Sequence, residues 1–384
     1  MTRPRLSPAG PAETNGSDDS DNRRNRTSKM TSITRLFHLT HNIFTRYPLL
    51  EVARTALHEP RLAWAYRRRS LRVPSLPARM MIDPINLCNL ECPLCPTGRH
   101  ITGMTRSRMP YDLFEHIVNL NPRLRILDLF NLGEPFLNND IFRMLSLCRK
   151  KKIRTAVHTN LAAYDTDWVE RIIETPPTRL HISVDGASRD SYVLYRVKGD
   201  FDRVRRNMDY LSRRIRETGK GPVVEWAFLY HKGNRQDIPA ARSLAEKLGF
   251  KFFVRPLVVP KHLGPEWHDP ETLASEAVSF RANVVCPHLW LQMTVKPTGA
   301  LTTCCFAYHD QDESASLAGI SCPEQLLELW NSSYYRRGRA CFRTESTYRE
   351  IPKPMLCETC NIYPRHGGLD PQEHPYDSTI RDWM

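Results

Sequence analysis

Three cysteines at short spacing are the residues of this sequence best suited to carry chemistry. Cys88, Cys92 and Cys95 follow the pattern Cys-x3-Cys-x2-Cys, which places three thiols within eight residues. Thiolates this close can hold one soft metal centre, because each sulfur–metal bond is only about 2.3 Å long. A structural zinc site would need a fourth ligand, for which His100 is the local candidate. An iron–sulfur cube held by three cysteines would instead leave one iron open to a substrate or cofactor.

A second group of cysteines lies towards the C-terminus. Cys286 and Cys304 are followed by the pair Cys357 and Cys360, and four thiolates in two pairs can close a metal site completely. Cys305 stands beside Cys304, so the ligand at that position is ambiguous by one residue. A zinc ribbon is the alternative to an iron–sulfur cluster here. The other three cysteines are interpreted as packing residues or as thiols near the site: Cys148, Cys322 and Cys341.

The elements that must position the first cysteines are predicted between about residues 78 and 265, where short apolar runs alternate with amphipathic segments. The predicted strands are Arg79–Ile82, Arg125–Phe130, Ile153–His158, Arg179–Val184, Val223–Leu229 and Phe250–Val254. The predicted helices are Tyr111–Leu120, Asp140–Lys150, Thr166–Glu174, a pair across Ser188–Glu217, and Gln236–Leu248. Six such units predict a partial (β/α)6 TIM-type barrel with a parallel sheet, in which chemistry sits at the C-terminal ends of the strands.

Polar motifs occur in chain order where these strands end. Asn131-Leu132-Gly133-Glu134-Pro135 follows the second strand, and His158-Thr159-Asn160 ends the third. Ser183-Val184-Asp185-Gly186 ends the fourth strand, and Tyr195-Arg196 comes shortly after it. Each motif alone is compatible with an ordinary turn, but together they predict one site at this edge of the sheet.

The cysteine spacing and these motifs together resemble the radical S-adenosylmethionine (SAM) superfamily. The resemblance implies that Cys88, Cys92 and Cys95 hold a [4Fe–4S] cluster whose open iron binds SAM. One electron from the cluster then cleaves SAM to methionine and a 5′-deoxyadenosyl radical, which abstracts a hydrogen atom from the substrate. Leu94 stands where the family usually has an aromatic residue, and Leu132 replaces the first glycine of the family's Gly-Gly-Glu-Pro loop.

The same resemblance implies where SAM is bound. The loop of Gly133, Glu134 and Pro135 would accept hydrogen bonds from the SAM ammonium group, a charge-assisted contact. Guanidinium suits bidentate pairing with a carboxylate, so Arg196 would pair with the carboxylate of SAM. The remaining SAM-binding residues implied by the family are Thr159 and Asn160, which would border SAM, and Ser183 and Asp185, which would face its ribose and methionine.

The C-terminal region resembles the SPASM/Twitch extensions of radical SAM enzymes. A hairpin is predicted across Met293–Leu301 with Gly299 in its turn, and helices are predicted over Pro323–Trp330 and Ser332–Cys341. The resemblance implies an auxiliary [4Fe–4S] cluster with four cysteine ligands, and the shorter Twitch type fits better because not all SPASM cysteines are present. Those ligands would be Cys286, Cys304, Cys357 and Cys360.

Composition and charge bound the remaining possibilities. The chain has 384 residues, 11 cysteines and a net charge of +13, of which +9 falls within residues 1–80. No apolar run approaches the roughly 18 residues of a membrane span and no signal peptide is evident, so a cytoplasmic location is expected. The expected organisation is a disordered tail (1–30), a basic helical extension (31–77), the barrel (78–265), the cluster domain (274–365) and a C-terminal tail (366–384).

The expected activity is oxidation or epimerisation of a small sugar-like or natural-product intermediate. Maturation of a ribosomally made peptide or protein, by crosslinking, epimerisation or oxidation, is the alternative. For an epimerase, the thiol that returns a hydrogen atom could be Cys305, Cys322 or Cys341. A flavodoxin- or ferredoxin-type electron donor is expected. No RNA-binding motif accompanies the basic extension, and packing of that extension on the barrel is favoured over contact with a membrane surface.

Overall fold

The structure is a computed structural model that describes residues 59–257, 267, 286–343 and 356–359. All of these belong to one compact unit, Arg54–Met384. The two predicted tails, most of the basic extension and Cys360 lie outside the described residues.

One open sheet of nine strands organises this unit, in the order β6-β5-β4-β3-β2-β1-β7-β8-β9. Neighbouring strands from β6 to β7 are parallel, and β8 and β9 are antiparallel to their neighbours. The first six strands are β1 (Arg79–Ile82), β2 (Ile126–Leu129), β3 (Arg154–Thr159), β4 (Arg179–Ser183), β5 (Val223–Tyr230) and β6 (Lys251–Pro256). They confirm the predicted parallel α/β fold and its partial, unclosed barrel.

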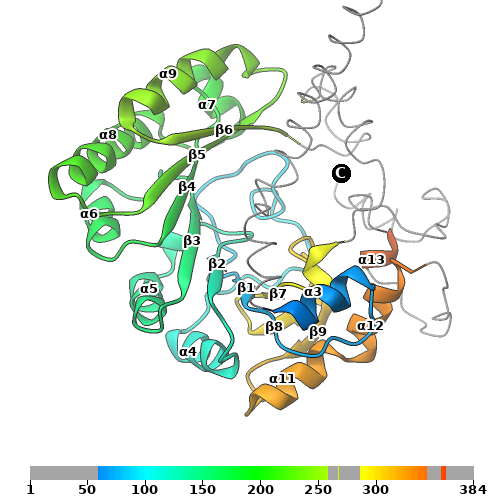
Figure 1. Cartoon of the computed structure of the whole chain (residues 1–384). Helices are drawn as coiled ribbons and strands as arrows, with labels where there is room; N and C mark the ends of the chain where they lie inside the picture. Colours follow the sequence, from blue (N-terminus) through cyan, green and yellow to red (C-terminus); the bar gives the residue numbers. More distant parts are fainter. Residues whose placement is uncertain (1–58, 258–266, 268–285, 344–355, 360–384) are drawn as a thin grey trace, which may run out of the picture. The chain divides into compact units, whose positions relative to one another are not determined.

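Helices follow the parallel strands and lie along one face of the sheet, as Figure 1 shows for α4, α5, α6, α8 and α9. Their bounds are α4 (Tyr111–Leu120), α5 (Ile141–Lys150), α6 (Thr166–Glu174), α7 (Arg189–Tyr195), α8 (Phe201–Thr218) and α9 (Ile238–Leu248). The long helix α8 begins where the Asp200 carboxylate accepts a hydrogen bond from Arg203 N. It ends at Gly219, whose φ of +63° glycine adopts without strain. Within the described ranges, no helix is both long and apolar enough to cross a bilayer.

The two faces of the parallel sheet differ in chemistry, because successive side chains of a strand point to opposite faces. Alternate strand residues such as Leu129, Ile182 and Trp226 are fully buried and join the apolar core formed with the helices. The intervening positions carry charged or imidazole side chains: Arg79, Asp128, His158, Arg179, His181 and Glu225. We call this second face the inner face of the sheet.

The C-terminal region continues the sheet. Strand β7 (Met293–Val295) pairs in parallel with β1, so the auxiliary region begins as a direct neighbour of the first barrel strand. Strand β8 (Ala300–Thr302) returns from it across Gly299 at φ +84°, which confirms the predicted hairpin, and β9 (Glu313–Ser316) follows. The helices of this region are α11 (Pro323–Trp330), α12 (Ser333–Ala340) and α13 (Leu356–Thr359).

The described end of the basic extension packs on this C-terminal region. Helix α3 (Pro60–Arg67) precedes residue Val73, whose backbone N–H and carbonyl both bond the side chain of Asn331. Arg339, which is fully buried, donates to the carbonyl of Leu71 at 2.9 Å. These contacts show that part of the extension is an integral part of the fold.

Candidate functional site

The loop after β1 carries the first three cysteines, and hydrogen-bond donors point at two of their sulfurs. Cys88 Sγ accepts from Leu90 N at 3.4 Å and from Asn160 Nδ2 at 3.7 Å. Cys92 Sγ accepts from Arg196 Nη1 at 3.8 Å. Donors of this kind stabilise anionic sulfur and tune iron–sulfur clusters. The donor set therefore fits a cluster held by these thiolates.

Burial makes ionisation of these thiols unfavourable without a metal. It raises the pKa of Cys88 to about 12, and the nearby Glu134 carboxylate adds to the effect. Burial also raises the pKa of Cys92, although Arg196 opposes the shift. A bound cation deprotonates a coordinating thiol outright, so a positively charged iron centre would supply the compensation that the protein interior lacks.

Glu134 joins the ends of β2 and β3. Its carboxylate is buried and accepts hydrogen bonds from Thr159 Oγ1 at 2.8 Å, Asn160 N at 2.7 Å and Phe136 N at 3.3 Å. Burial raises its pKa to about 7, against the effect of these donors. A carboxylate offers about four acceptor positions, so this network leaves capacity for one more donor. Glu134 thus brings the predicted residues Thr159 and Asn160 into one cluster, and the SAM ammonium contact stays a prediction.

Gly133 permits the close approach of this loop to the cysteine loop. A Cβ at this position would lie 2.0 Å from the carbonyl oxygen of Ile85. The next residue, Glu134, donates its backbone N–H to the carbonyl of Leu87 at 2.9 Å. Only glycine fits between these two loops without moving backbone atoms.

Asp185 and Arg196 form a buried ion pair beside the cysteine loop. Arg196 Nε donates to Asp185 Oδ2 at 2.6 Å, and Leu229 N donates to Asp185 Oδ1 at 2.8 Å. Burial opposes a charged guanidinium, but the Asp185 carboxylate holds the pKa of Arg196 above its usual value. Arg196 therefore connects the end of β4 to Cys92, and its predicted pairing with the SAM carboxylate stays a prediction. Ser183 ends β4 on the same face as Asp185.

Three asparagines hold the strand ends and the cysteine loop in place. Asn234 Nδ2 donates to the carbonyls of Asp185 and Leu229, so this buried side chain fixes the ends of β4 and β5. Asn89 accepts from Asn160 Nδ2 at 2.9 Å, and Asn86 binds the backbone of the segment that follows the cysteines. The roles of Asn86 and Asn89 were not predicted, although both flank Cys88 in an otherwise apolar loop.

Asp83 is a further buried carboxyl that sequence reasoning missed. It directly follows β1, and its Oδ2 accepts from Leu132 N at 3.2 Å. Its Oδ1 has no hydrogen-bond partner among the described residues. Burial raises its pKa to about 8, against the nearby ammonium of Lys296. No local sequence signal marks Asp83 as a site residue. The groups around its buried carboxyl, Leu132 and Lys296, follow β2 and β7 and are distant in the sequence.

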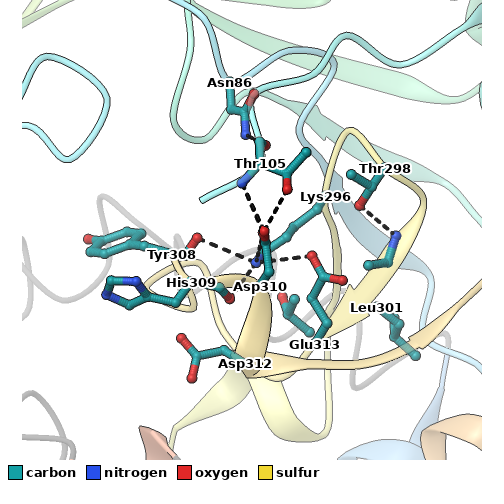
Figure 2. A network of polar contacts seen from close by, with 12 residues as sticks. Asn86, Thr105, Lys296, Thr298, Leu301, Tyr308, His309, Asp310, Asp312 and Glu313 are labelled. Atoms are coloured by element: carbon teal, nitrogen blue, oxygen red, sulfur yellow. Dashed lines mark hydrogen bonds and ion pairs between the residues drawn. The ribbon is translucent and has the colours of Figure 1, made fainter. Parts of the chain in front are cut away.

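A polar network links the cysteine loop to the C-terminal region, as Figure 2 shows. Asp310 accepts from Thr105 N at 2.9 Å and from Thr105 Oγ1 at 2.6 Å. Lys296, which is 6% exposed, donates to the His309 carbonyl at 2.6 Å and lies 3.2 Å from Glu313. Since Thr105 is bound in turn by Asn86, this network fixes the segment after Cys304 and Cys305 against the first cysteine loop.

Three of the four predicted auxiliary ligands lie in the described region. Cys286 and Cys357 are buried, and Cys304 Sγ accepts from Phe306 N at 3.4 Å. The Cys305 thiol, burial and Cys286 all raise the pKa of Cys304. Cys305 Sγ instead lies 4.0 Å from His288 Nε2. The backbone donor at Cys304 favours it over Cys305 as the cluster ligand.

Helix α13 is held in place beside these cysteines. Arg337 on α12 binds Glu358 through two parallel hydrogen bonds of 2.6 and 2.8 Å. This bidentate ion pair fixes the position of the neighbouring Cys357. Cys360, the fourth predicted ligand, lies outside the described residues.

Two histidines lie side by side on the inner face. His158 and His181 are register partners on β3 and β4, with ring centroids 4.2 Å apart, and Phe130 stacks on His158 at 3.5 Å. His181 Nε2 lies 3.1 Å from Glu225 Oε2, and its Nδ1 has no hydrogen-bond partner among the described residues. Burial, reinforced by Arg179, Arg255 and Arg79, lowers the pKa of His181 to about 3. The ring is therefore neutral, although the Glu225 carboxylate would favour its charged form.

This neutral histidine predicts a pH-dependent stability. The unfolded ring takes up a proton below about pH 6.5, whereas the folded ring resists protonation until about pH 3. The stability that the neutral His181 ring contributes to the folded state is thus fully present above about pH 6.5, and it is lost as the pH falls towards 3. Between pH 7 and 5 we expect up to about 2 kcal/mol of stability to be lost through His181.

Urea unfolding of the reconstituted protein at pH 5 and pH 7, without oxygen, measures this loss. His181→Asn should reduce the difference between the free energies of unfolding measured at pH 5 and pH 7. The matched substitution His100→Asn, on a side chain that is 56% exposed, should leave it near the wild-type value. Equal pH dependence of wild type and His181→Asn would contradict the assignment of a neutral buried ring.

Comparison with known protein families identifies the family to which this chain belongs. Residues 82–224 match the radical SAM superfamily, and residues 286–361 match SPASM, an iron–sulfur cluster-binding domain. The chain is a radical SAM protein with a SPASM domain. These families imply [4Fe–4S] clusters and SAM as its cofactors. The matched ranges contain the two cysteine groups, whereas the narrower Twitch assignment stays a prediction.

Similar proteins differ widely in what they act on. Fe-coproporphyrin III synthase of Methanosarcina barkeri is 27% identical over 197 residues, which cover 49% of this chain and 48% of the synthase. The match thus spans about half the length of that curated relative. The structure of Streptococcus suis SuiB bound to S-adenosylmethionine is similar with a TM-score of 0.55 and 16% identity, over 85% of this chain and 78% of SuiB.

A second SuiB structure was solved with the precursor peptide SuiA. It is similar to this chain with a TM-score of 0.55 and 16% identity, over 75% of this chain and 72% of SuiB. At this level of identity the similarity to SuiB establishes the fold.

Proposed function

We propose that this radical SAM protein abstracts a hydrogen atom from a C–H bond of a small, polar, sugar-like or other biosynthetic intermediate, which is thereby oxidised or epimerised. When bound and reduced, the first cluster and SAM supply the 5′-deoxyadenosyl radical for that abstraction. The chain's own residues have to bind SAM, hold the substrate beside it and manage the substrate's protons.

The observation that carries this proposal is a column of polar side chains on the inner face. His181, Ser183 and Asp185 alternate along β4 and its end, so they share one face. On β3, His158 and Asn160 form a parallel column, because His158 is the register partner of His181. At the C-terminal ends of β3 and β4, the columns consist of the predicted SAM-binding residues Asn160, Ser183 and Asp185. The two histidines lie two residues earlier in their strands than Asn160 and Ser183. A substrate held against the histidines would be next to SAM.

The chemistry of the histidines suits a substrate with hydroxyl groups. His181 Nε2 lies 3.1 Å from Glu225 Oε2, and the buried Nδ1 of the neutral ring has no hydrogen-bond partner among the described residues. A buried polar atom without a partner is costly, and a substrate hydroxyl could satisfy it.

In this proposal, the residues around the cysteine loop have positioning roles. Glu134 holds the backbone of Asn160 and the hydroxyl of Thr159 next to the SAM site. Arg196 is held by Asp185 and donates to Cys92 Sγ, which would stabilise negative charge on a cluster ligand. The auxiliary cluster expected at Cys286, Cys304, Cys357 and Cys360 gives the protein a second redox centre, which suits an oxidation.

A peptide substrate is the second candidate, and the fold similarity to SuiB favours it. SuiB was solved with a precursor peptide bound. In this alternative the same inner face would receive one side chain of the peptide.

The test compares the two substrate classes with the reconstituted, full-length protein under reducing, oxygen-free conditions. Candidate sugars and polyols, and candidate peptides, are incubated with SAM, and 5′-deoxyadenosine is measured together with the mass of the substrate. We expect a small polyol to raise 5′-deoxyadenosine release. That substrate should then either lose two hydrogen atoms or, for an epimerase in D2O, gain deuterium. If only a peptide couples 5′-deoxyadenosine release to a change in its own mass, the small-molecule proposal is wrong.

A further inference from the structure

Helix α3 differs in chemistry between its two sides. One side carries Leu62 and Ala65, which are buried, and Tyr66, whose ring meets that of Trp290 edge-on at 6.0 Å. This side packs on the rest of the protein. With 3.6 residues in each helical turn, a second set of residues points away from it. We call this second side the outer face, and it consists of four exposed residues of the helix and its C-terminal cap: Arg61, Trp64, Arg67 and Arg68.

The positive charge of the outer face is not neutralised by neighbouring carboxylates. No Asp or Glu occurs in the sequence between Glu59 and Asp83. Among the described residues, none of the three arginines of the outer face forms an ion pair with a carboxylate. Glu59, directly before the helix, is buried and binds Arg123 at 3.1 Å instead. The outer face is therefore a cationic surface that is open to a partner of negative charge.

A tryptophan lies in the middle of these cations. Trp64 is 59% exposed, although its ring is among the largest side chains that proteins bury. Arg68 lies over this ring, with its guanidinium carbon 5.3 Å from the ring centroid. Tryptophan is enriched where a membrane meets water, because its ring is largely apolar and its N–H can bind polar headgroups. Arginine binds phosphate groups through two parallel hydrogen bonds.

We propose that the outer face of α3 is a docking surface for a membrane that contains anionic phospholipids. A helical segment with arginine and tryptophan on one side lies in the plane of such a membrane, with the ring at the level of the headgroups. Each cation near an anionic membrane raises the affinity by about fivefold, so three arginines and one tryptophan give a reversible attachment. The net charge of residues 1–80, which is +9, has the sign that this attachment needs.

The shape and composition of the outer face fit a membrane better than a nucleic acid. Proteins that bind single-stranded nucleic acids combine a basic groove with several aromatic side chains, on which successive bases stack. The outer face is the convex side of one short helix and carries one aromatic residue, Trp64. Membrane contact is also compatible with the packing of α3 on the protein, because the two contacts use opposite sides of the helix.

Flotation of the reconstituted full-length protein with lipid vesicles measures this docking. Vesicles of phosphatidylcholine alone are compared with vesicles in which about one third of the lipid is phosphatidylglycerol. We expect wild type to bind the anionic vesicles at low salt and to bind the neutral vesicles much more weakly. Arg61→Glu/Arg68→Glu should weaken binding to anionic vesicles by about tenfold or more, and this difference should shrink as added salt screens the charges.

A second variant separates the contribution of the ring from that of the charges. Trp64→Ala should also weaken binding to anionic vesicles, by a factor that added salt changes little, because insertion of the ring is not a charge interaction. Both variants change only exposed side chains, so their urea unfolding should stay close to that of wild type. Reduced vesicle binding in a variant that unfolds normally is then a property of the surface.

The matched control reverses the same number of charges elsewhere. Arg149→Glu/Lys150→Glu changes two exposed cations at the end of α5, and this variant should bind anionic vesicles like wild type. An equal loss of binding in this control would show that net charge alone attracts the protein, and would overturn the proposal.

Two further results would contradict the docking surface, and neither depends on the reaction that the protein catalyses. One is wild-type binding that is no stronger to anionic vesicles than to neutral ones. The other is loss of binding to a random-sequence RNA in Arg61→Glu/Arg68→Glu, with vesicle binding unchanged, which would make the outer face a nucleic-acid surface.

Discussion

Replacing Cys88, Cys92 and Cys95 together with alanine should abolish the release of 5′-deoxyadenosine from SAM. The three thiols lie on one loop, and donors from Leu90, Asn160 and Arg196 point at two of their sulfurs. Without the thiolates no open iron is available to bind SAM and pass it an electron. Chromatographic measurement of 5′-deoxyadenosine after anaerobic reduction with dithionite checks the result.

Cys148→Ala is the matched control for this experiment. Cys148 is a fully buried thiol on α5 that belongs to the apolar core. Its replacement removes a small apolar side chain and should cost stability, yet SAM cleavage should continue at a rate close to that of wild type. Persistent reductive cleavage in the triple variant would remove the three cysteines from the role assigned to them.

Arg196→Met should lower the free energy of unfolding by about 3–5 kcal/mol, because it leaves the buried carboxylate of Asp185 without its ion-pair partner. Asp185 has no exposed surface, and burial already raises its pKa. The methionine side chain approximates the volume of the arginine stem, so the loss would come mainly from the unpaired charge. Urea unfolding of the reconstituted protein under anaerobic conditions measures the change.

Two further variants make this prediction specific. Asp185→Asn combined with Arg196→Met removes the buried charge as well, so the double variant should be more stable than Arg196→Met alone. Arg213→Met breaks a surface pair with Glu217 on α8 and should cost no more than about 0.5 kcal/mol. If Arg196→Met costs as little as Arg213→Met, the Asp185–Arg196 pair does not support the site.

Local patterns were enough to predict the elements that carry the site. The bounds of β1, α4 and α6 in the barrel, and of α11 in the C-terminal region, agree with the sequence prediction. The other barrel elements differ from it by one or two residues at one or both ends. Apolar periodicity, capping residues and breaking prolines act over a few residues, so they can be read from the chain. Because parallel strands bring their C-terminal ends to one edge, the order of the motifs also predicted that Glu134, Asn160 and Asp185 would lie at the same edge of the sheet as the cysteine loop.

Contacts between distant parts of the chain could not be predicted in this way. The pairing of β1 with β7 joins residues more than two hundred positions apart, and no local pattern in either strand specifies its partner. The hydrogen bond from Thr105 to Asp310 likewise depends on the tertiary fold, which brings these two residues together. Asp83 is a buried carboxyl only because the fold places it beside Leu132. Lys296 reads as an ordinary hairpin lysine in the sequence, but the fold buries it among backbone carbonyls and carboxylates.

The most direct test of two cluster sites in this radical SAM protein is the metal and sulfide content of the full-length chain after anaerobic reconstitution. We expect about eight iron and eight sulfide per chain in wild type, and about four of each in the Cys88→Ala/Cys92→Ala/Cys95→Ala variant. About four iron in wild type would contradict the auxiliary cluster. Zinc in place of iron at both cysteine groups would contradict the whole account.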